Sequence, residues 1–218
     1  MKIVTWNIER PTKTGVRIQA IIKKLNEVDA DILILTETNH SIHLGDSYNY
    51  FHTSLIPNKY YKEGERRVII YSKYNSVSEH VTFRTDTSVC IELETSLGSL
   101  LVYGTVMGIF GNRQKDFEID LDQQLLDFET LSQKGNLCIA GDLNMSFSDN
   151  YYFTTSGRNK LNMSFQKLNL RNLTAHIPQN IDHIILPRNL LNDKEVNITT
   201  WNMDKKLSDH IGIAIEII

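Results

Sequence analysis

The side chains of Asp142 and Asn144 follow directly on a short apolar run, Cys138–Ala140, which is typical of a buried strand. Residues two apart on an extended chain point the same way, so this carboxylate and carboxamide can face one site. A carboxylate can orient or deprotonate a water molecule, and an amide can donate to a phosphoryl oxygen without adding charge. Because Gly, Asp and Asn are also the commonest turn residues, Gly141–Asn144 taken alone fits a plain turn at least as well.

Further polar side chains stand at predicted strand ends, namely Asn7, Glu37, Asp182, Asp209 and His210. Glu37 and Asp209 offer the hard oxygen ligands that suit magnesium, which keeps several waters and needs only one or two protein carboxylates. His210, held by a carboxylate such as Asp182, can donate to phosphate or carry a proton. Asn7, like Asn144, can donate to non-bridging oxygens. Such a set suits the hydrolysis of a phosphate ester.

Each of these residues also has a plainer interpretation. An Asp-His dipeptide is usually a strand-start cap or a surface pair, and Glu37 can simply mark the exit of a strand into solvent. Asp182 lies beside His183 in an apolar run, where an unpaired buried carboxylate would be costly, so a partner is expected. The functional interpretation therefore depends on the joint occurrence of these residues in this order.

Hydrophobic periodicity predicts the elements that position the first of these residues. A strand is predicted over 2–7, and apolar residues at i, i+3, i+4 and i+7 predict an amphipathic helix over 14–27. The nearly continuous apolar run 31–36 is typical of a strand buried on both faces, and it ends at Glu37. This strand–helix–strand order predicts that Asn7 and Glu37 lie on neighbouring strands.

The middle of the chain is predicted to be rich in strands. Residues 40–64 are interpreted as loops around one short strand, and the spacing of His40, His43 and His52 fits no metal-ligand pattern, so these are surface or substrate-rim residues. An antiparallel meander is predicted from strands at 66–71, 77–83, 88–95 and 99–106.

The second half returns to helical periodicity over 114–132, with Gly135 as the expected C-terminal cap. One face carries a core stripe, and the acids of the other face are interpreted as solvated, namely Asp120, Asp122, Asp127 and Glu129. A loop over 146–158 and a short helix around 161–168 follow. Further strands are predicted at 181–186, 196–201 and 211–215.

Length and composition indicate one large domain over 1–218, with 41% hydrophobic and 22% charged residues. The net charge of -3 provides no general cationic field, so a nucleic-acid substrate would depend on local basic groups and a bound metal. Cys90 and Cys138 lack CxxC spacing and are expected to be reduced core thiols. Without a signal-peptide pattern or a long apolar run, the expected location is cytoplasmic, with no membrane partner. Oligomeric state is not indicated.

The sequence resembles the endonuclease/exonuclease/phosphatase superfamily, which includes deoxyribonucleases, abasic-site endonucleases, neutral sphingomyelinases and inositol-polyphosphate 5-phosphatases. The resemblance covers residues 2–215 and rests on five segments: Thr5–Glu9, Leu35–Thr38, Gly141–Asn144, Ile181–Ile185 and Ser208–His210. It implies a four-layer α/β sandwich with two packed, mostly antiparallel sheets, flanking helices and a site at one end. It also implies a magnesium- or manganese-dependent phosphoesterase.

By the same resemblance, each motif residue acquires an expected role. Glu37 would bind metal with Asn7 and Asp209 close by, Asp142 would align the attacking water, Asn144 would contact phosphate, and Asp182 would orient His210. Which group acts as the general base is left open.

The chain departs from its relatives at one predicted strand end. Many relatives have a His or Tyr that contacts phosphate where this chain has Thr105, and Arg113 or Asn112 in the following loop is the proposed compensation. Glu9, at a position often occupied by Asp or Asn, is interpreted as an accessory residue of the metal shell.

Three function classes follow, and a nuclease is favoured. Short loops, the Tyr- and Lys-bearing stretch 58–67 and an aromatic loop at 147–153 that suits base stacking all favour nucleic acid. A phosphatase or phosphodiesterase of small molecules or lipid headgroups fits the negative charge slightly better. A non-catalytic binding module is the third alternative, which the complete motif set disfavours.

Overall fold

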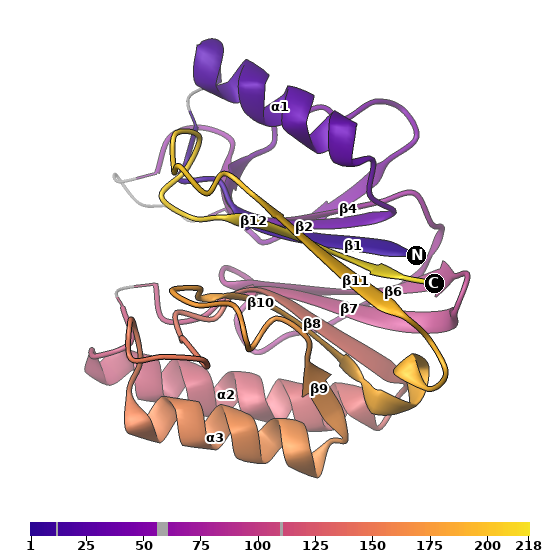
Figure 1. The fold of residues 1–218 in the computed structure, drawn as a ribbon, viewed down its shortest axis with the longest axis vertical. Coiled ribbons are helices and arrows are strands. Elements are labelled where there is room, and N and C mark those ends of the chain that lie inside the picture. The colour runs from indigo at the N-terminus through magenta and orange to yellow at the C-terminus, as the bar shows by residue number, and fades with distance from the viewer. Residues whose placement is uncertain (12, 56–60, 110) are drawn as a thin grey trace.

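The computed structural model describes residues 1–11, 13–55, 61–109 and 111–218. Within them, two six-stranded sheets pack face to face, with α1 (Val16–Val28) over one and α2 (Lys115–Ser132) and α3 (Thr155–Lys167) over the other (Figure 1). A short 3-10 helix, η1, spans Arg188–Leu191. The predicted four-layer α/β sandwich is confirmed.

The first sheet holds both ends of the chain and has the order β11-β12-β1-β2-β4-β3. Its strands are β1 (Lys2–Asn7), β2 (Ile32–Asn39), β3 (Asn49–His52), β4 (Glu65–Ser72), β11 (Val196–Trp201) and β12 (Gly212–Ile217). Strand β1 is parallel to β2 and antiparallel to β12, and Asn7 lies opposite Thr36. Asn7 and Glu37 therefore lie on neighbouring strands, as predicted.

The second sheet has the order β5-β6-β7-β8-β10-β9. Its strands are β5 (Ser76–His80), β6 (Ser88–Thr95), β7 (Gly98–Val106), β8 (Asn136–Asp142), β9 (Leu170–Asn172) and β10 (Asp182–Pro187). Strand β8 runs antiparallel to β10, and Asp142 lies directly opposite Asp182. The sheet thus pairs two candidate site carboxylates by register.

Alternating side chains divide the apolar residues of each sheet between two layers. Ile34, Val102 and Ile184 pack in the core between the sheets. Leu33 faces α1, and Ile139 faces α2 and α3. Because the strands are covered on both faces, their sequences are nearly continuous apolar runs.

The predicted meander is correct only for β5, β6 and β7. Strand β4 belongs to the first sheet, where it pairs with β2 and β3. Its side chains are apolar on both faces, with Val68 and Ile70 between the sheets and Ile69 and Tyr71 on the α1 side. This pattern suits a strand that is covered by the other sheet on one face and by α1 on the other, rather than a strand of a meander with one face in solvent.

Two smaller predictions were wrong at the ends of α2 and α3, and one short strand was missed. Helix α2 ends through Gln133 in a right-handed conformation, so Gly135 does not cap it; a Cβ at Gly135 would instead lie 2.8 Å from Leu101. Helix α3 already begins at Thr155, where the Thr154 hydroxyl caps the amide of Gly157, inside the predicted loop. Strand β9 was not predicted.

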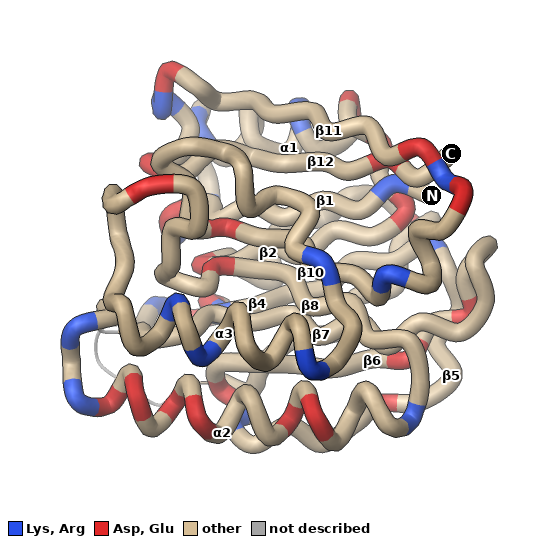
Figure 2. The backbone as a smooth tube through the Cα atoms, turned by 60° about the horizontal axis from the view of Figure 1, so that its bottom comes forward, with Lys and Arg blue, Asp and Glu red and all other residues tan. Residues whose placement is uncertain are grey.

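The acids of α2 do not form one solvated face, contrary to the prediction. Asp120 is only 3% exposed, and Asp127 accepts hydrogen bonds from the Tyr103 hydroxyl and the Phe83 amide. Asp122 and Glu129 instead pair with lysines of α3, and Figure 2 shows acidic residues along α2 beside basic ones on α3. Helix α2 contacts the sheet and α3 at once, so several of its faces are covered.

Cys90 and Cys138 are free and buried, as predicted. Among the described residues, no helix combines the length and apolar character needed to cross a membrane.

His183 is a fully buried histidine whose Nε2 lies 2.9 Å from the Met145 carbonyl. Burial lowers the pKa of His183 to about 4, so the ring is neutral in the folded protein. The unfolded chain takes up this proton near the ordinary pKa of 6.5. We therefore expect the free energy of unfolding to fall between pH 6.5 and 4, by about 3 kcal/mol at most from this residue.

Urea unfolding of the wild type and of His183→Gln at pH 7 and pH 4.5 checks this. The variant lacks the titrating ring and should lose less stability on acidification. Equal losses in both proteins would contradict the assignment.

Candidate active site

The predicted site residues converge where one end of each sheet meets the other. Asn7 stands at the end of β1 and bridges the sheets, since its Nδ2 donates to Glu37 Oε1 at 3.2 Å and to Asp142 Oδ2 at 3.1 Å. Asp182 opens β10 opposite Asp142. The turn before β12 brings His210 to the same place, with its Nδ1 2.6 Å from Asp182 Oδ2. Strand order and register thus assemble five residues that are distant in sequence.

Glu37 interrupts the regular backbone of β2. Its φ of 47° lies in the left-handed region, which is strained for a residue other than glycine, and its carbonyl accepts from the Arg10 amide at 2.7 Å. Its side chain is half-buried beside Asn7. Backbone strain of this kind clusters at functional sites, so the conformation supports a functional role for Glu37.

Asp182 and His210 form a tightly coupled pair. Asp182 is 1% exposed, and its second oxygen, Oδ1, is buried without a hydrogen-bond partner in the structure. Burial alone would lower the pKa of His210, but the charges of Asp182, Asp142 and Asp209 outweigh it and raise that pKa to about 10. His210 is therefore a cation at neutral pH, available to a negatively charged group.

The pKa of Asp142 is also raised, but for a carboxylic acid this favours the neutral form. Burial, together with the charge of Asp182, raises the pKa of Asp142 to about 7, against the lowering effect of His210. Its Oδ1 accepts from the Asn144 amide at 2.9 Å, and its Oδ2 accepts from Asn7. A carboxylate with a pKa near neutrality is suited to accept a proton from water.

The turn that carries His210 is fixed by residues outside the predicted set. The Ser208 hydroxyl donates to the Asn7 carbonyl at 2.7 Å and accepts from the His210 amide at 3.1 Å. The Asn202 amide donates to the carbonyls of Ser208 and His210, and the Trp6 indole also donates to the latter. Asn202 was not predicted from the sequence, in which its position directly after a predicted strand is the available signal. In the structure it adopts a left-handed φ of 60°.

Removing the Ser208 hydroxyl should loosen this turn. In Ser208→Ala the partly buried amide of His210 loses its acceptor, so we expect the free energy of unfolding to fall by about 1–2 kcal/mol and activity to fall with it. Urea unfolding and steady-state kinetics measure both effects. Ser132→Ala, which removes a hydroxyl bound to a helix carbonyl far from the site, is the matched control. Equal stability losses in the two variants would contradict a special role for Ser208.

Asn144 adopts a left-handed φ of 49°, and its side chain faces the loop after β7. Its Nδ2 donates to the Met107 carbonyl at 2.8 Å, and its own carbonyl accepts from Asn112 Nδ2 at 2.7 Å. Asn112 thus fixes the backbone of Asn144 and lies 2% exposed, with its Oδ1 unpartnered in the structure. A direct contact of Asn144 with phosphate stays a prediction.

The prediction for Thr105 was wrong. Thr105 is fully buried, and its hydroxyl donates to Gln124 on α2 at 2.8 Å. Side chains alternate along β7, and this one points to the helix layer instead of the site. Arg113 is exposed in the loop beside Asn112, so it alone of the pair is open to a substrate.

Two acids lie at the rim of the cluster. Asp209 is 67% exposed, and its Oδ1 lies 3.7 Å from His210 Nε2. Glu9 is 51% exposed and forms an ion pair with Arg17 at 3.1 Å, while its amide donates to Asn7 Oδ1. The structure therefore places both near the site but outside the buried network.

The donor set fits a hydrated divalent cation better than an all-protein cage. Among the described residues, no three His, Cys, Asp or Glu side chains form a group that could enclose a metal ion. Magnesium needs only one or two carboxylates, and Glu37 can supply one. The charges of Asp182 and Glu37 both raise the pKa of Asp142, and His210 opposes them, so a cation beside Glu37 would offset this concentration of acidic groups. The histidines at 40, 43 and 52 belong to no such group.

A cavity of about 220 Å³ opens beside the Asp182–His210 pair. Its lining includes Tyr151, Tyr152, Lys205 and Asp209. Aromatic and basic side chains thus border the candidate catalytic residues. Of the predicted stretch 58–67, residues 58–60 lie outside the described residues.

Comparisons with known proteins concern the family and the fold of the chain. The model of the endonuclease/exonuclease/phosphatase family matches residues 4–210. An endonuclease/exonuclease/phosphatase structure from Beutenbergia cavernae has a TM-score of 0.73 at 14% identity, covering 99% of this chain and 70% of that one. An AP endonuclease from Archaeoglobus fulgidus has a TM-score of 0.72 at 13% identity, covering 100% and 99%.

A third similar structure is a 3′ phosphatase from Neisseria bound to a product DNA hairpin, with a TM-score of 0.73 at 15% identity, covering 100% of this chain and 99% of that one. At such identities the structural likeness establishes the fold. No match was found among curated proteins.

Proposed function

The chain belongs to the endonuclease/exonuclease/phosphatase family, whose members hydrolyse phosphate esters, and we propose that it is a divalent-metal-dependent phosphodiesterase of nucleic acid. The observation that carries the proposal is the network in which Asn7 joins Glu37 to Asp142 while Asp182 holds His210 opposite. It combines a site for a cation, a carboxylate suited to activate water and a protonated imidazole.

Each residue has a defined task in this proposal. Asp142 orients the attacking water and accepts its proton, for which a pKa of about 7 is suited. Protonated His210 donates through Nε2 to a phosphoryl oxygen, because Nδ1 is bound to Asp182. Magnesium or manganese held by Glu37 would supply further positive charge to the phosphoryl group.

Nucleic acid is the substrate that the surroundings of the site favour. The cavity beside His210 presents the rings of Tyr151 and Tyr152 for stacking and Lys205 for phosphate contact. The related structures include an AP endonuclease and a phosphatase holding DNA. Because the net charge is -3, binding would depend on such local contacts and on the metal.

Hydrolysis of labelled single-stranded, double-stranded and abasic-site DNA and of RNA, with magnesium or EDTA, tests the proposal. We expect magnesium-dependent cleavage that is lost in Asp142→Ala. Turnover of small phosphomonoesters or bis-p-nitrophenyl phosphate without any polymer cleavage would instead favour a small-molecule substrate. No turnover of any ester would contradict enzymatic function.

A further inference from the structure

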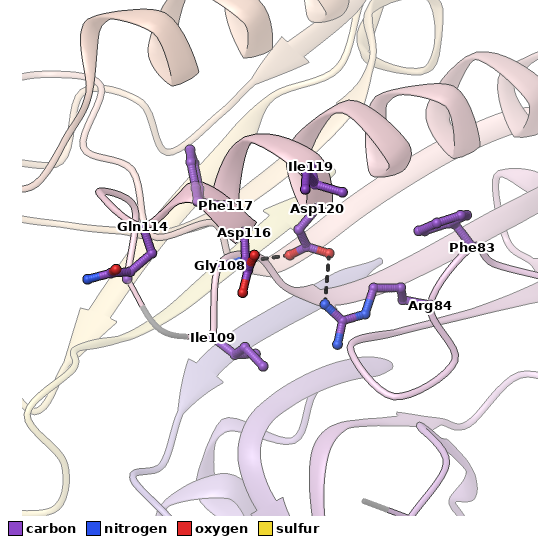
Figure 3. A pocket seen from close by; sticks show the side chains of 10 residues that line it. Phe83, Arg84, Gly108, Ile109, Gln114, Asp116, Phe117, Ile119 and Asp120 are labelled. Carbon is purple, nitrogen blue, oxygen red and sulfur yellow. Dashed lines mark hydrogen bonds and ion pairs between the residues drawn. The ribbon is translucent and has the colours of Figure 1, made fainter.

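A second cavity, of about 290 Å³, lies between α2 and the turn that precedes β6 (Figure 3). Its lining comes from three segments of the chain and includes Phe83, Arg84, Gly108, Ile109, Asp116, Ile119 and Asp120. None of these residues belongs to the predicted active site. Ligand pockets in proteins typically have volumes of about 300–1,000 Å³, and this cavity is near the lower end of that range. Its volume therefore suits a single ring system and is too small for a base pair.

This cavity shares a wall with the active site. The Gly108 amide donates to Asp120 Oδ2 at 2.9 Å, while the Gly108 carbonyl lies 3.4 Å from Asn144 Nδ2. Further along the same loop, Asn112 binds the Asn144 backbone. The loop that contains Gly108 and Asn112 therefore borders the cavity on α2 and also contacts Asn144, so the cavity adjoins the place where a phosphodiester is expected to bind.

The chemistry of the cavity suits a base better than a phosphate. Phe83 and Ile119 are both apolar and 54% exposed, although each lines the cavity. Arg84 lies 2.8 Å from Asp86 and 3.8 Å from Asp120, so its charge is already compensated. The remaining carboxylate, that of exposed Asp116, repels phosphate but accepts N–H donors.

We propose that this cavity binds an unpaired nucleobase with an exocyclic amino group, adjacent to the cleaved phosphodiester; the inference rests on the proposed nuclease function. The base stacks on Phe83, and its amino group donates to Asp116. A base inside a duplex cannot enter, so the cavity favours single-stranded or frayed substrates with adenine, cytosine or guanine over thymine.

The test compares Phe83→Ala and Asp116→Asn with Leu126→Ala, which truncates an equally exposed residue of α2 outside the cavity. We expect Phe83→Ala to lower the ratio of kcat/KM for a single-stranded adenine-rich oligonucleotide to that for bis-p-nitrophenyl phosphate about tenfold. Leu126→Ala should keep the wild-type ratio. Asp116→Asn should reduce the preference for adenine over thymine next to the cleaved bond.

Adenosine, which has no phosphate, provides a separate binding assay by NMR titration. Binding that Phe83→Ala weakens supports the inference, even if the wild type cleaves no nucleic acid and the proposed function fails. An unchanged kinetic ratio together with no adenosine binding overturns it and leaves the cavity to another class of partner. Equal losses on both substrates overturn it too, because they indicate a role in supporting the catalytic loop.

Discussion

Replacing His210 by alanine is expected to lower kcat by about a thousandfold, because its imidazolium is the cation that interacts with both Asp142 and Asp182 in the buried network. The fold should survive, since the turn is held through the backbone carbonyl of His210 and through Ser208. Steady-state kinetics on the substrate found by the nuclease assay measure the loss. Near-normal turnover would contradict the assigned role.

The pH profile separates a chemical role of His210 from a structural one. The raised pKa of about 10 keeps the ring protonated below that pH, so wild-type kcat/KM should have a high-pH limb, a fall in rate as pH rises through about 10. A separate fall below pH 7 is expected from protonation of Asp142. His210→Ala should lack the high-pH limb. Asp182→Asn keeps an acceptor for His210 Nδ1 but removes the negative charge. It should therefore lower activity less than His210→Ala does, and the fall in kcat/KM at high pH should move to a lower pH. A high-pH limb at the same pH in all three proteins would refute the pairing.

The sequence predicted which polar residues lie together at the ends of the strands better than it predicted the side chains around them. Asn7, Glu37, Asp142, Asp182 and His210 were recognisable because each stands at or near a strand end, where an apolar pattern stops. Their convergence depends on strand order, and only the N-terminal pair follows from a local strand–helix–strand unit. The register of Asp142 with Asp182 comes from an antiparallel pairing between strands about forty residues apart, which the periodicity of each strand alone does not specify.

The errors have a common physical origin in contacts between distant segments. Thr105 was assigned to the substrate by position, but alternation along β7 turns its hydroxyl toward Gln124. Asp120 was assigned to solvent by its place on a helix, but the loop after β7 buries it. In both cases the partner comes from another element, so local periodicity gives the element and not the environment of the side chain.

Glu37→Gln is expected to lower kcat by about a hundredfold or more, because the loss of one carboxylate charge weakens the hold on the cation. The substitution keeps an oxygen that can accept from Asn7, so the link between the two sheets is preserved. The weaker binding of magnesium should also be visible without a substrate, as a smaller stabilisation of the fold by the metal. At a magnesium concentration about 100-fold above its dissociation constant, the wild type should gain about 2.7 kcal/mol in the free energy of unfolding relative to EDTA.

Urea unfolding with magnesium and with EDTA measures that gain directly. Glu37→Gln should show little or none of it, while Glu216→Gln, which changes an exposed carboxylate on β12, should keep all of it. Magnesium stabilisation that persists in Glu37→Gln would place the cation elsewhere, and the exposed Asp209 would be the next ligand to replace. Because binding is measured in the absence of turnover, this outcome stays informative even if the substrate is not nucleic acid.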